Sequence, residues 1–221
     1  MSAAALAGRR IVVSAGPTYE DIDPVRYIGN RSSGKMGFAI AEAAARAGAE
    51  VALVAGPVHP DTPRGVRRHD VRSAAQLRDA VLAALPADAY VAAAAVADWT
   101  PRARAAQKLK KRDGQDTLTL ELVRTPDVLA EVAAHASLRP RLVVGFAAET
   151  ENLEANARAK LERKRVDLVA ANLVGVQGSG FEADDNALAV FARDGSTTRL
   201  GPAPKRALAE ALVRLIAERL S

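Results

Sequence analysis

The segment 29–37 has the residue types and spacing that best suit the binding of an anion, and it reads G-N-R-S-S-G-K-M-G. Small residues let the backbone approach a ligand closely, and the hydroxyls of Ser32 and Ser33 can donate hydrogen bonds. A helix is predicted to begin at Gly34, and a helix N-terminus attracts phosphate. Lys35 adds a cation. We expect Ser32, Ser33, Gly34 and Lys35 to bind phosphate. The alternative is a serine-capped helix start without a ligand.

The same run matches the G-x-x-x-x-G-K portion of a P-loop. Met36, however, stands where a P-loop needs Ser or Thr to hold magnesium. The long polar segment 19–33 before it is also unlike the short turn of a P-loop. We therefore exclude a Walker-type NTPase and keep phosphate binding.

The segment 92–99 is a second candidate, since its five alanines leave room for a flat group against a strand end. Asp98 follows as a polar group at the tip. A tightly packed alanine strand, with Asp98 capping a turn, explains the same pattern. From the pattern alone, that simpler alternative is favoured.

Basic residues supply further candidates. The run Lys108–Lys111 contains three lysines and lies in a stretch without helical or strand periodicity. Lys160 and Lys164 stand four residues apart on one predicted helix face, after the strand-end segment 145–150. Each cluster suits a polyphosphate, although charge runs are usually solvated surface.

The elements that must position these residues alternate between strand and helix, which predicts an α/β fold: a Rossmann-like, mostly parallel sheet with helices on both faces. The D-G pair at 194–195 adds a small antiparallel hairpin. Ligands of such sheets bind beyond the carboxyl ends of the strands, where the candidates fall. Strands are expected at 11–14, 50–54, 66–71, 90–96, 117–123, 142–147, 168–171, 187–192 and 197–200, and helices at 34–48, 73–85, from 125 onward, 151–165 and 205–220.

Composition narrows the function classes. The 221 residues carry a net charge of +5, which suits anionic ligands, and include no cysteine, which excludes disulfides, thiolate metal sites and a cysteine nucleophile. No apolar run is long enough to span a bilayer, so we expect a cytoplasmic protein without membrane contact. Aromatic residues for base stacking are scarce at 4%, which argues against nucleic-acid binding.

Several short motifs occur together in a fixed order. They are A-G-P-T at 15–18, D-P-V-R at 23–26, N-R-S-S-G-K-M-G at 30–37, A-A-V-A-D at 94–98, K-L-K-K at 108–111, T-P-D at 125–127 and V-G-F-A-A-E-T at 144–150. Each is weak alone, but the set is specific. With it the chain resembles the phosphopantothenoylcysteine synthetase (phosphopantothenate–cysteine ligase) domain of the bacterial bifunctional coenzyme A biosynthesis protein.

The resemblance implies a Rossmann-like homodimer that uses CTP and Mg²⁺, with Mn²⁺ as the other candidate metal, to convert 4′-phosphopantothenate to an acyl-cytidylate. L-cysteine then forms an amide, and CMP and pyrophosphate are released. No metal ligand can be assigned from the sequence. We expect residues 1–8 to be a flexible leader or linker remnant, and 9–221 to form the ligase domain. The resemblance also implies that, as in many bacteria, a flavin-dependent phosphopantothenoylcysteine decarboxylase precedes this domain in the full-length protein, with a free-standing ligase as the alternative.

The resemblance also implies site residues. Asn30 and Lys108 would be catalytic, with the Asn30 amide as a donor to the oxyanion of the second step. Arg26, Asn30 and Ala95 would bind phosphopantothenate. The residues that would bind the nucleotide are Ser32, Ser33, Gly34, Lys35, Ala92, Ala93, Ala94, Asp98, Lys108, Pro126, Asp127, Val128, Leu129, Phe146, Lys160 and Lys164.

Two other functions compete. A nicotinamide- or flavin-dependent oxidoreductase would need G-x-G-x-x-G after the first strand, but the chain has A-G-P-T there. A nucleic-acid-binding module would need a basic face with stacking aromatics, whereas the basic residues fall at predicted strand ends.

Overall fold

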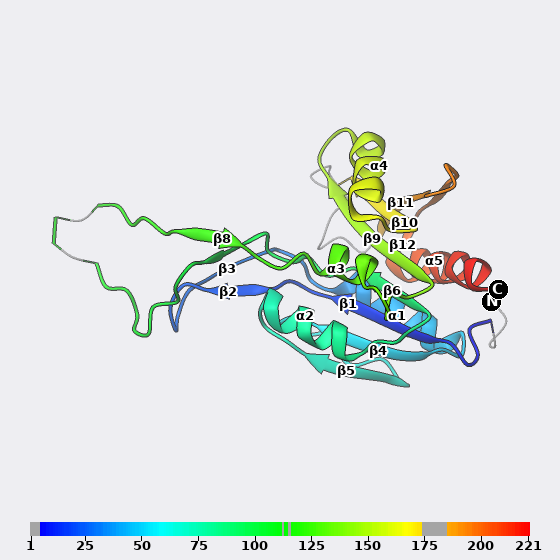
Figure 1. Ribbon diagram of the computed structural model, residues 1–221, viewed down its shortest axis with the longest axis horizontal. Helices are drawn as coiled ribbons and strands as arrows, with labels where there is room; N and C mark the ends of the chain where they lie inside the picture. Colours follow the sequence, from blue (N-terminus) through cyan, green and yellow to red (C-terminus); the bar gives the residue numbers. More distant parts are fainter. Residues whose placement is uncertain (1–4, 112, 115, 174–184) are drawn as a thin grey trace.

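An eight-stranded sheet forms the centre of the molecule in the computed structural model, which describes residues 5–111, 113–114, 116–173 and 185–221 (Figure 1). In space the strands follow the order β12-β11-β10-β9-β6-β1-β4-β5. Its strands are β1 (Arg10–Ala15), β4 (Glu50–Ala55), β5 (Val66–Asp70), β6 (Ala89–Ala92), β9 (Leu142–Glu149), β10 (Leu168–Leu173), β11 (Asp185–Ala192) and β12 (Thr197–Pro204). The helices are α1 (Lys35–Arg46), α2 (Ala74–Ala83), α3 (Val128–Ala134), α4 (Leu153–Lys164) and α5 (Lys205–Leu220).

Six neighbouring strands of this sheet, β10-β9-β6-β1-β4-β5, are parallel to one another. Their order is that of a Rossmann sheet. From β1 the chain adds β4 and β5 on one side and then β6, β9 and β10 on the other. In such folds the ligand crevice lies at this reversal, beside the carboxyl ends of β1 and β6. The β11–β12 hairpin adds two antiparallel strands at the β10 edge. The predicted fold class, including the hairpin, is therefore confirmed.

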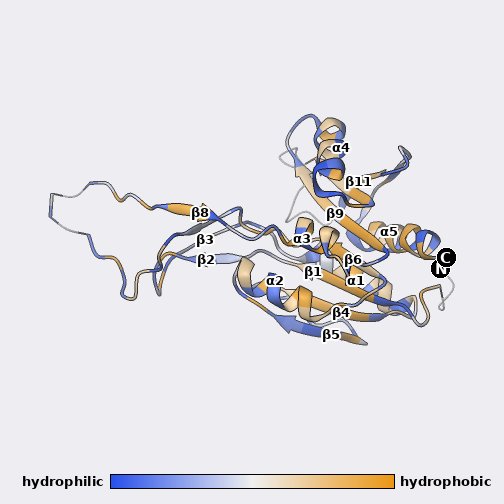
Figure 2. Cartoon of the chain, in the orientation of Figure 1, coloured by the Kyte–Doolittle hydropathy of each residue, from blue (hydrophilic) through white to orange (hydrophobic). Residues whose placement is uncertain are grey.

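Alternate residues of the strands face two separate cores. Ile11 and Val13 pack on the side of α1 and α5, whereas Val12 and Tyr90 pack on the side of α2, α3 and α4. Strands covered on both faces must be apolar throughout, which Figure 2 shows for β4 and β9, while the edge strand β5 is largely hydrophilic. The two-sided burial fixes the carboxyl ends of the strands along one edge.

The helix α1 lies unusually close to β1. A Cβ atom added at Gly37 would come within 2.4 Å of the Ala15 Cβ atom, so only glycine permits this contact. The close approach brings the N-terminus of α1 directly over the end of β1, beside the crevice.

Two hairpins project from the body as an arm (Figure 1). One pairs β2 (Tyr19–Asp21) with β3 (Tyr27–Gly29), and the other pairs β7 (Trp99–Pro101) with β8 (Leu122–Arg124). We call β2, β3, β7, β8 and the segments joining each pair the arm. The polar segment 19–33, in which no strand was expected, thus contains a hairpin, with the ring centroids of Tyr19 and Tyr27 stacked 3.9 Å apart.

Two strand predictions were wrong. The expected strand at 117–123 is paired only at Leu122–Arg124, and Leu118 is exposed because the described residues of the arm form no hydrophobic core. The strand expected to reach residue 96 leaves the sheet ladder after Ala92.

One helix start also differs. A helix is predicted from residue 125 onward, but α3 begins at Val128 with Asp127 as its N-cap, since the Thr125 hydroxyl donates to the Ala97 carbonyl at 2.6 Å. Within the segment predicted to be a leader, Leu6 is buried, and its N–H donates to the Ala47 carbonyl. Residues 1–4 lie outside the described residues. Among the helices of the described chain, none combines the length and apolarity needed to cross a membrane.

Candidate functional site

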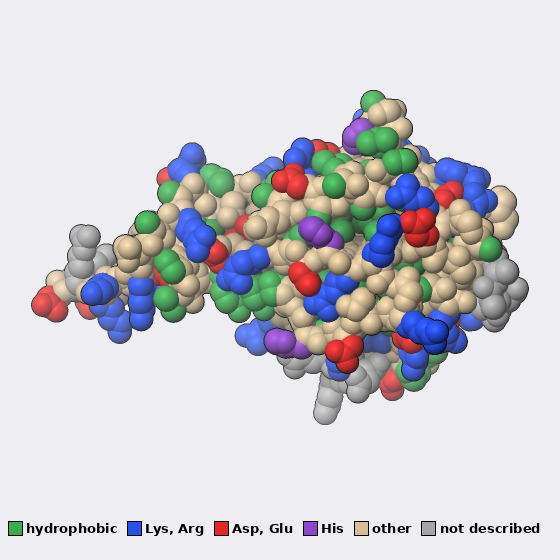
Figure 3. Space-filling view, turned by 90° about the horizontal axis from the view of Figure 1, so that it is seen from below, with side chains coloured by type: hydrophobic (Ala, Val, Ile, Leu, Met, Phe, Trp, Pro, Cys, Tyr) green, Lys and Arg blue, Asp and Glu red, His purple; other side chains and the backbone are tan. Residues whose placement is uncertain are grey.

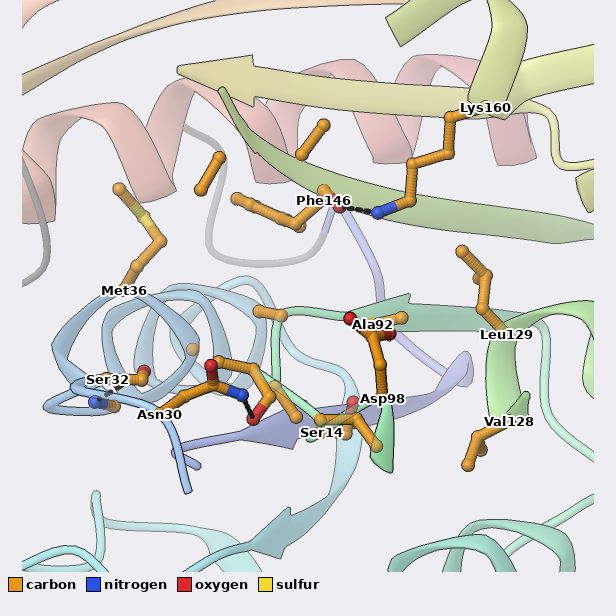
Figure 4. A pocket seen from close by; sticks show the side chains of 18 of the residues that line it. Ser14, Asn30, Ser32, Met36, Ala92, Asp98, Val128, Leu129, Phe146 and Lys160 are labelled. Atoms are coloured by element: carbon orange, nitrogen blue, oxygen red, sulfur yellow. Dashed lines mark hydrogen bonds between the residues drawn. The ribbon is translucent and has the colours of Figure 1, made fainter. Parts of the chain in front are cut away.

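A cavity of about 740 Å³ lies at the carboxyl edge of the sheet, between β1 and β6 (Figure 4). Its position is the crevice that the reversal of strand order predicts. Most residues expected from the sequence converge on it. Those that line it are Asn30, Ser32, Ser33, Gly34, Lys35, Ala92, Ala93, Ala94, Ala95, Asp98, Pro126, Asp127, Val128, Leu129, Phe146, Lys160 and Lys164.

The floor of the cavity is the alanine segment that follows β6. The Ala93 N–H donates to the Ser14 carbonyl at 3.0 Å, and the Ala95 N–H donates to the Gly16 carbonyl at 2.8 Å. These bonds continue the sheet contacts past the last ladder residue. The small side chains of this segment are only partly buried and face the cavity, where they leave space for a planar group.

Asn30 is held at the cavity wall by one hydrogen bond. Its Nδ2 donates to the Ala95 carbonyl at 2.9 Å (Figure 4). A side-chain amide has two N–H groups, so the second can donate to a ligand. The bond fixes the amide where a neutral hydrogen-bond donor faces the cavity.

Two lysines of α4 supply positive charge on the opposite side. Lys160 Nζ donates to the Phe146 carbonyl at 2.5 Å, and burial, followed by repulsion from Lys164, lowers the pKa of Lys160 (Figure 4). Lys164 forms an ion pair with Asp127. Burial alone would raise the pKa of Asp127, but the bonds from Lys164 and the Ala130 N–H outweigh it, and the net shift is downward.

The N-termini of α1 and α5 open on the same cavity. Neither helix has a side-chain cap or an acid in its first turn, and each begins with a cavity-lining lysine, Lys35 or Lys205. Ion pairs between Glu42 and Arg206 and between Arg46 and Glu210 join the helices along their sides. Helix N-termini carry partial positive charge, so the cavity favours anions from two directions.

The chain matches the family described as "DNA/pantothenate metabolism flavoprotein C-terminal domain" over residues 6–220. The chain belongs to this family. Two curated relatives are both called Coenzyme A biosynthesis bifunctional protein CoaBC. The Vibrio cholerae protein is 50% identical over 97% of this chain and 54% of its own length. The Bacillus subtilis protein is 47% identical over 90% of this chain and 48% of its own length.

The chain therefore spans about half the length of the curated relatives it matches. A crystal structure of the C-terminal domain of CoaBC superposes with a TM-score of 0.81 at 36% identity, covering 98% of this chain and 97% of that one. A family protein from Streptococcus pneumoniae, at 22% identity and a TM-score of 0.80, supports the fold alone.

Two predicted site residues of this family member do not line the cavity. Lys108 is exposed on the arm. Arg26, also on the arm, forms an ion pair with Asp23 and donates to the Leu109 carbonyl at 2.8 Å. The cavity of a single chain therefore contains the predicted floor, Asn30 and the α4 lysines, but not these two cations.

Several lining residues were not predicted. Ser14 and Tyr90, joined at 3.0 Å through their hydroxyls, are buried behind the alanine floor. Asn172 lies near the end of β10, and Asn186 and Lys205 are buried polar residues from β11 and α5. Asn172 could have been found by reading every strand end. Nothing local in the sequence marks the other two.

Proposed function

We propose that this chain is a phosphopantothenate–cysteine ligase of coenzyme A biosynthesis, which acts in the cytoplasm. It would join 4′-phosphopantothenate to L-cysteine with CTP, and release CMP and pyrophosphate. Relatives at about half identity are named for coenzyme A biosynthesis, which supports the pathway. The observation that carries the reaction class is the convergence of Asn30, Lys160 and Lys164 on one cavity at the Rossmann crevice.

In the first step, a carboxylate oxygen of phosphopantothenate attacks the α-phosphorus of CTP and pyrophosphate leaves. Both reactants are anions, so the site must supply positive charge and hold them in line. Lys160 and Lys164 supply charge from α4, and the N-termini of α1 and α5 supply it from the other side. No protein nucleophile is needed, in keeping with a chain that has no cysteine.

In the second step, the cysteine amine attacks the acyl carbonyl, and the C–O bond to CMP breaks. The carbonyl oxygen gains negative charge on the way. The free N–H of the Asn30 amide can donate to it, and a neutral donor fixed in place needs no reorganisation when the charge develops.

Ligases of this kind use a divalent metal, for which we propose Mg²⁺ or Mn²⁺. The described residues contain no group of three or more His, Cys, Asp or Glu that could hold one. A metal bound with a nucleotide takes most of its ligands from phosphates and water, and needs one or two carboxylates. Asp98 is exposed in the cavity lining and fits that need, whereas Asp127 is paired with Lys164. The metal would neutralise triphosphate charge.

We further propose that the chain forms a homodimer through the arm. Among the described residues, the exposed large hydrophobics are Val25, Tyr27, Trp99, Leu118, Leu122 and Leu173. All but Leu173 belong to the arm, where Figure 3 shows hydrophobic and basic side chains side by side. Apolar groups gathered on a projection favour contact with another protein surface. We also propose that, in the full-length protein, this chain is fused to a flavin-dependent phosphopantothenoylcysteine decarboxylase, since it covers about half the length of relatives called bifunctional.

Ligand-induced stabilisation tests the choice of nucleotide. CTP with Mg²⁺ should raise the Tm by several degrees, since a ligand at 100 times its Kd adds about 2.7 kcal/mol. NADPH and a mixed-sequence oligonucleotide should leave the Tm unchanged, because the sequence has no G-x-G-x-x-G after its first strand and only 4% aromatic residues for base stacking. A larger shift with ATP than with CTP would overturn the CTP assignment and leave the ligase proposal. Stabilisation by NADPH alone would overturn both.

A further inference from the structure

The arm contains a buried carboxylate with an unusually complete set of donors. Asp23 is 1% exposed. It accepts hydrogen bonds from the backbone N–H groups of Val25 at 2.8 Å, Arg26 at 2.9 Å and Leu109 at 3.1 Å. The guanidinium of Arg26 donates to it through Nε at 3.0 Å and through Nη2. A buried charge is stable only when it is paired in this way.

The Asp23–Arg26 pair binds both backbone polar groups of Leu109, which lies in the basic run Lys108–Lys111. Asp23 accepts from the Leu109 N–H, and Arg26 Nη2 donates to the Leu109 carbonyl at 2.8 Å. The Ala105 N–H also donates to the Ile22 carbonyl at 2.9 Å. Segments some 80 residues apart in the sequence are thereby joined at the tip of the β2–β3 hairpin.

The Asp23 carboxyl of this pair stays ionised well into acid. Hydrogen bonding from Arg26 lowers the pKa of Asp23 well below its usual range, against the opposing effect of burial. A carboxyl with a depressed pKa keeps its partners as long as the pH stays above that value, and releases them only in acid.

Lys108 is the residue next to this fixed point. Its side chain is exposed, and no hydrogen bond or ion pair joins it to the rest of the described chain. Its location therefore depends on the backbone at Leu109. We propose that Asp23 is a positioning residue for the nucleotide step, which, through Arg26 and the backbone of Leu109, sets where the Lys108 ammonium meets the triphosphate. This inference rests on the proposed function.

The variant Asp23→Asn tests the inference, because asparagine keeps the shape and loses the charge. We expect kcat/KM for CTP in pyrophosphate release to fall about tenfold, as for loss of a charged hydrogen bond, mainly through KM. Tryptic cleavage between 102 and 111 should become faster without ligand. The matched control is Asp167→Asn, which removes the charge from a carboxylate on the body that pairs with Arg139 at 2.9 Å and accepts from the Val143 N–H at 2.8 Å. It should change neither measurement.

The variant Lys108→Gln decides whether Asp23 acts through the lysine. In that background, Asp23→Asn should add less than about twofold, because residues in one unit are not additive. If Asp23→Asn does not fold, Arg26→Lys replaces it, because lysine keeps the charge but cannot bond to Asp23 and Leu109 at once through a guanidinium. The effect of Arg26→Lys should likewise be non-additive with Lys108→Gln. Independent, multiplying effects or unchanged cleavage would overturn the inference. A wild type that releases no pyrophosphate would overturn the proposed function, while the cleavage result would still decide whether the pair holds the segment.

Discussion

Replacing Asn30 with aspartate should stop amide formation while the acyl-cytidylate accumulates. An ionised carboxylate cannot donate to the developing oxyanion and repels it, and loss of such a donor costs about 10²- to 10³-fold in rate. The first step should suffer less, because its new charge develops on the phosphates, nearer the α4 lysines. Quenched reactions analysed by mass spectrometry should show the intermediate.

The variant also removes the Asn30 bond to the Ala95 carbonyl, so a control for local distortion is needed. Asn30→Ala removes both N–H groups without adding charge. It should slow amide formation, with less accumulation of intermediate than the aspartate variant. If both half-reactions fall together in both variants, Asn30 binds substrate or holds the loop. If neither falls, its place at the acyl carbon is wrong.

Replacing Lys160 with methionine should impair the first step. Methionine keeps most of the side-chain volume and removes a partly buried cation whose pKa burial already lowers. Loss of a charged donor to phosphate should slow pyrophosphate release by roughly 10- to 100-fold. Rapid-quench measurement of pyrophosphate with saturating phosphopantothenate gives the rate of this step.

Arg163→Met is the matched control, since Arg163 is exposed on the same helix and does not line the cavity. Its rate should equal that of the wild type. A Lys160→Met enzyme with normal pyrophosphate release but slow amide formation would instead assign Lys160 to the acyl side of the cavity.

The sequence predicted those parts of the fold that strong periodicity and clear stops define. Helix α5 has the predicted bounds, because its apolar face repeats over four turns and Pro204 precedes it. The mostly parallel sheet followed from the alternation of strands and helices. The three-residue strands of the arm were missed, since they are too short to show a period.

The strand predicted at 117–123 was wrong for a physical reason. Leu118, Leu120 and Leu122 alternate as a strand against a core does, but the described residues of the arm form no core to meet them. The helix predicted from residue 125 onward begins later because Thr125 and Asp127 are both good caps. The carbonyl of Ala97 engages Thr125, which leaves Asp127 as the cap.

The site was predictable where side chains follow parallel strands. The alanine segment after β6 and Phe146 near the end of β9 meet at one edge because the sheet brings strand ends together. Lys205 was missed because it follows a strand of the hairpin, and only the return of β12 to the direction of β10 places it at that edge. The location of Arg26 and Lys108 on the arm depends on contacts between distant segments, which no local pattern encodes.

The central claim is that the carboxylate of phosphopantothenate attacks the α-phosphorus of CTP. Phosphopantothenate labelled with oxygen-18 in its carboxylate tests it directly. One labelled oxygen must form the bridge of the acyl-cytidylate and leave with the nucleotide when the amine breaks the C–O bond. Mass spectrometry of the products should find one labelled oxygen in CMP and none in pyrophosphate. Label in inorganic phosphate, with CDP as the nucleotide product, would show attack at the γ-phosphorus and contradict the account.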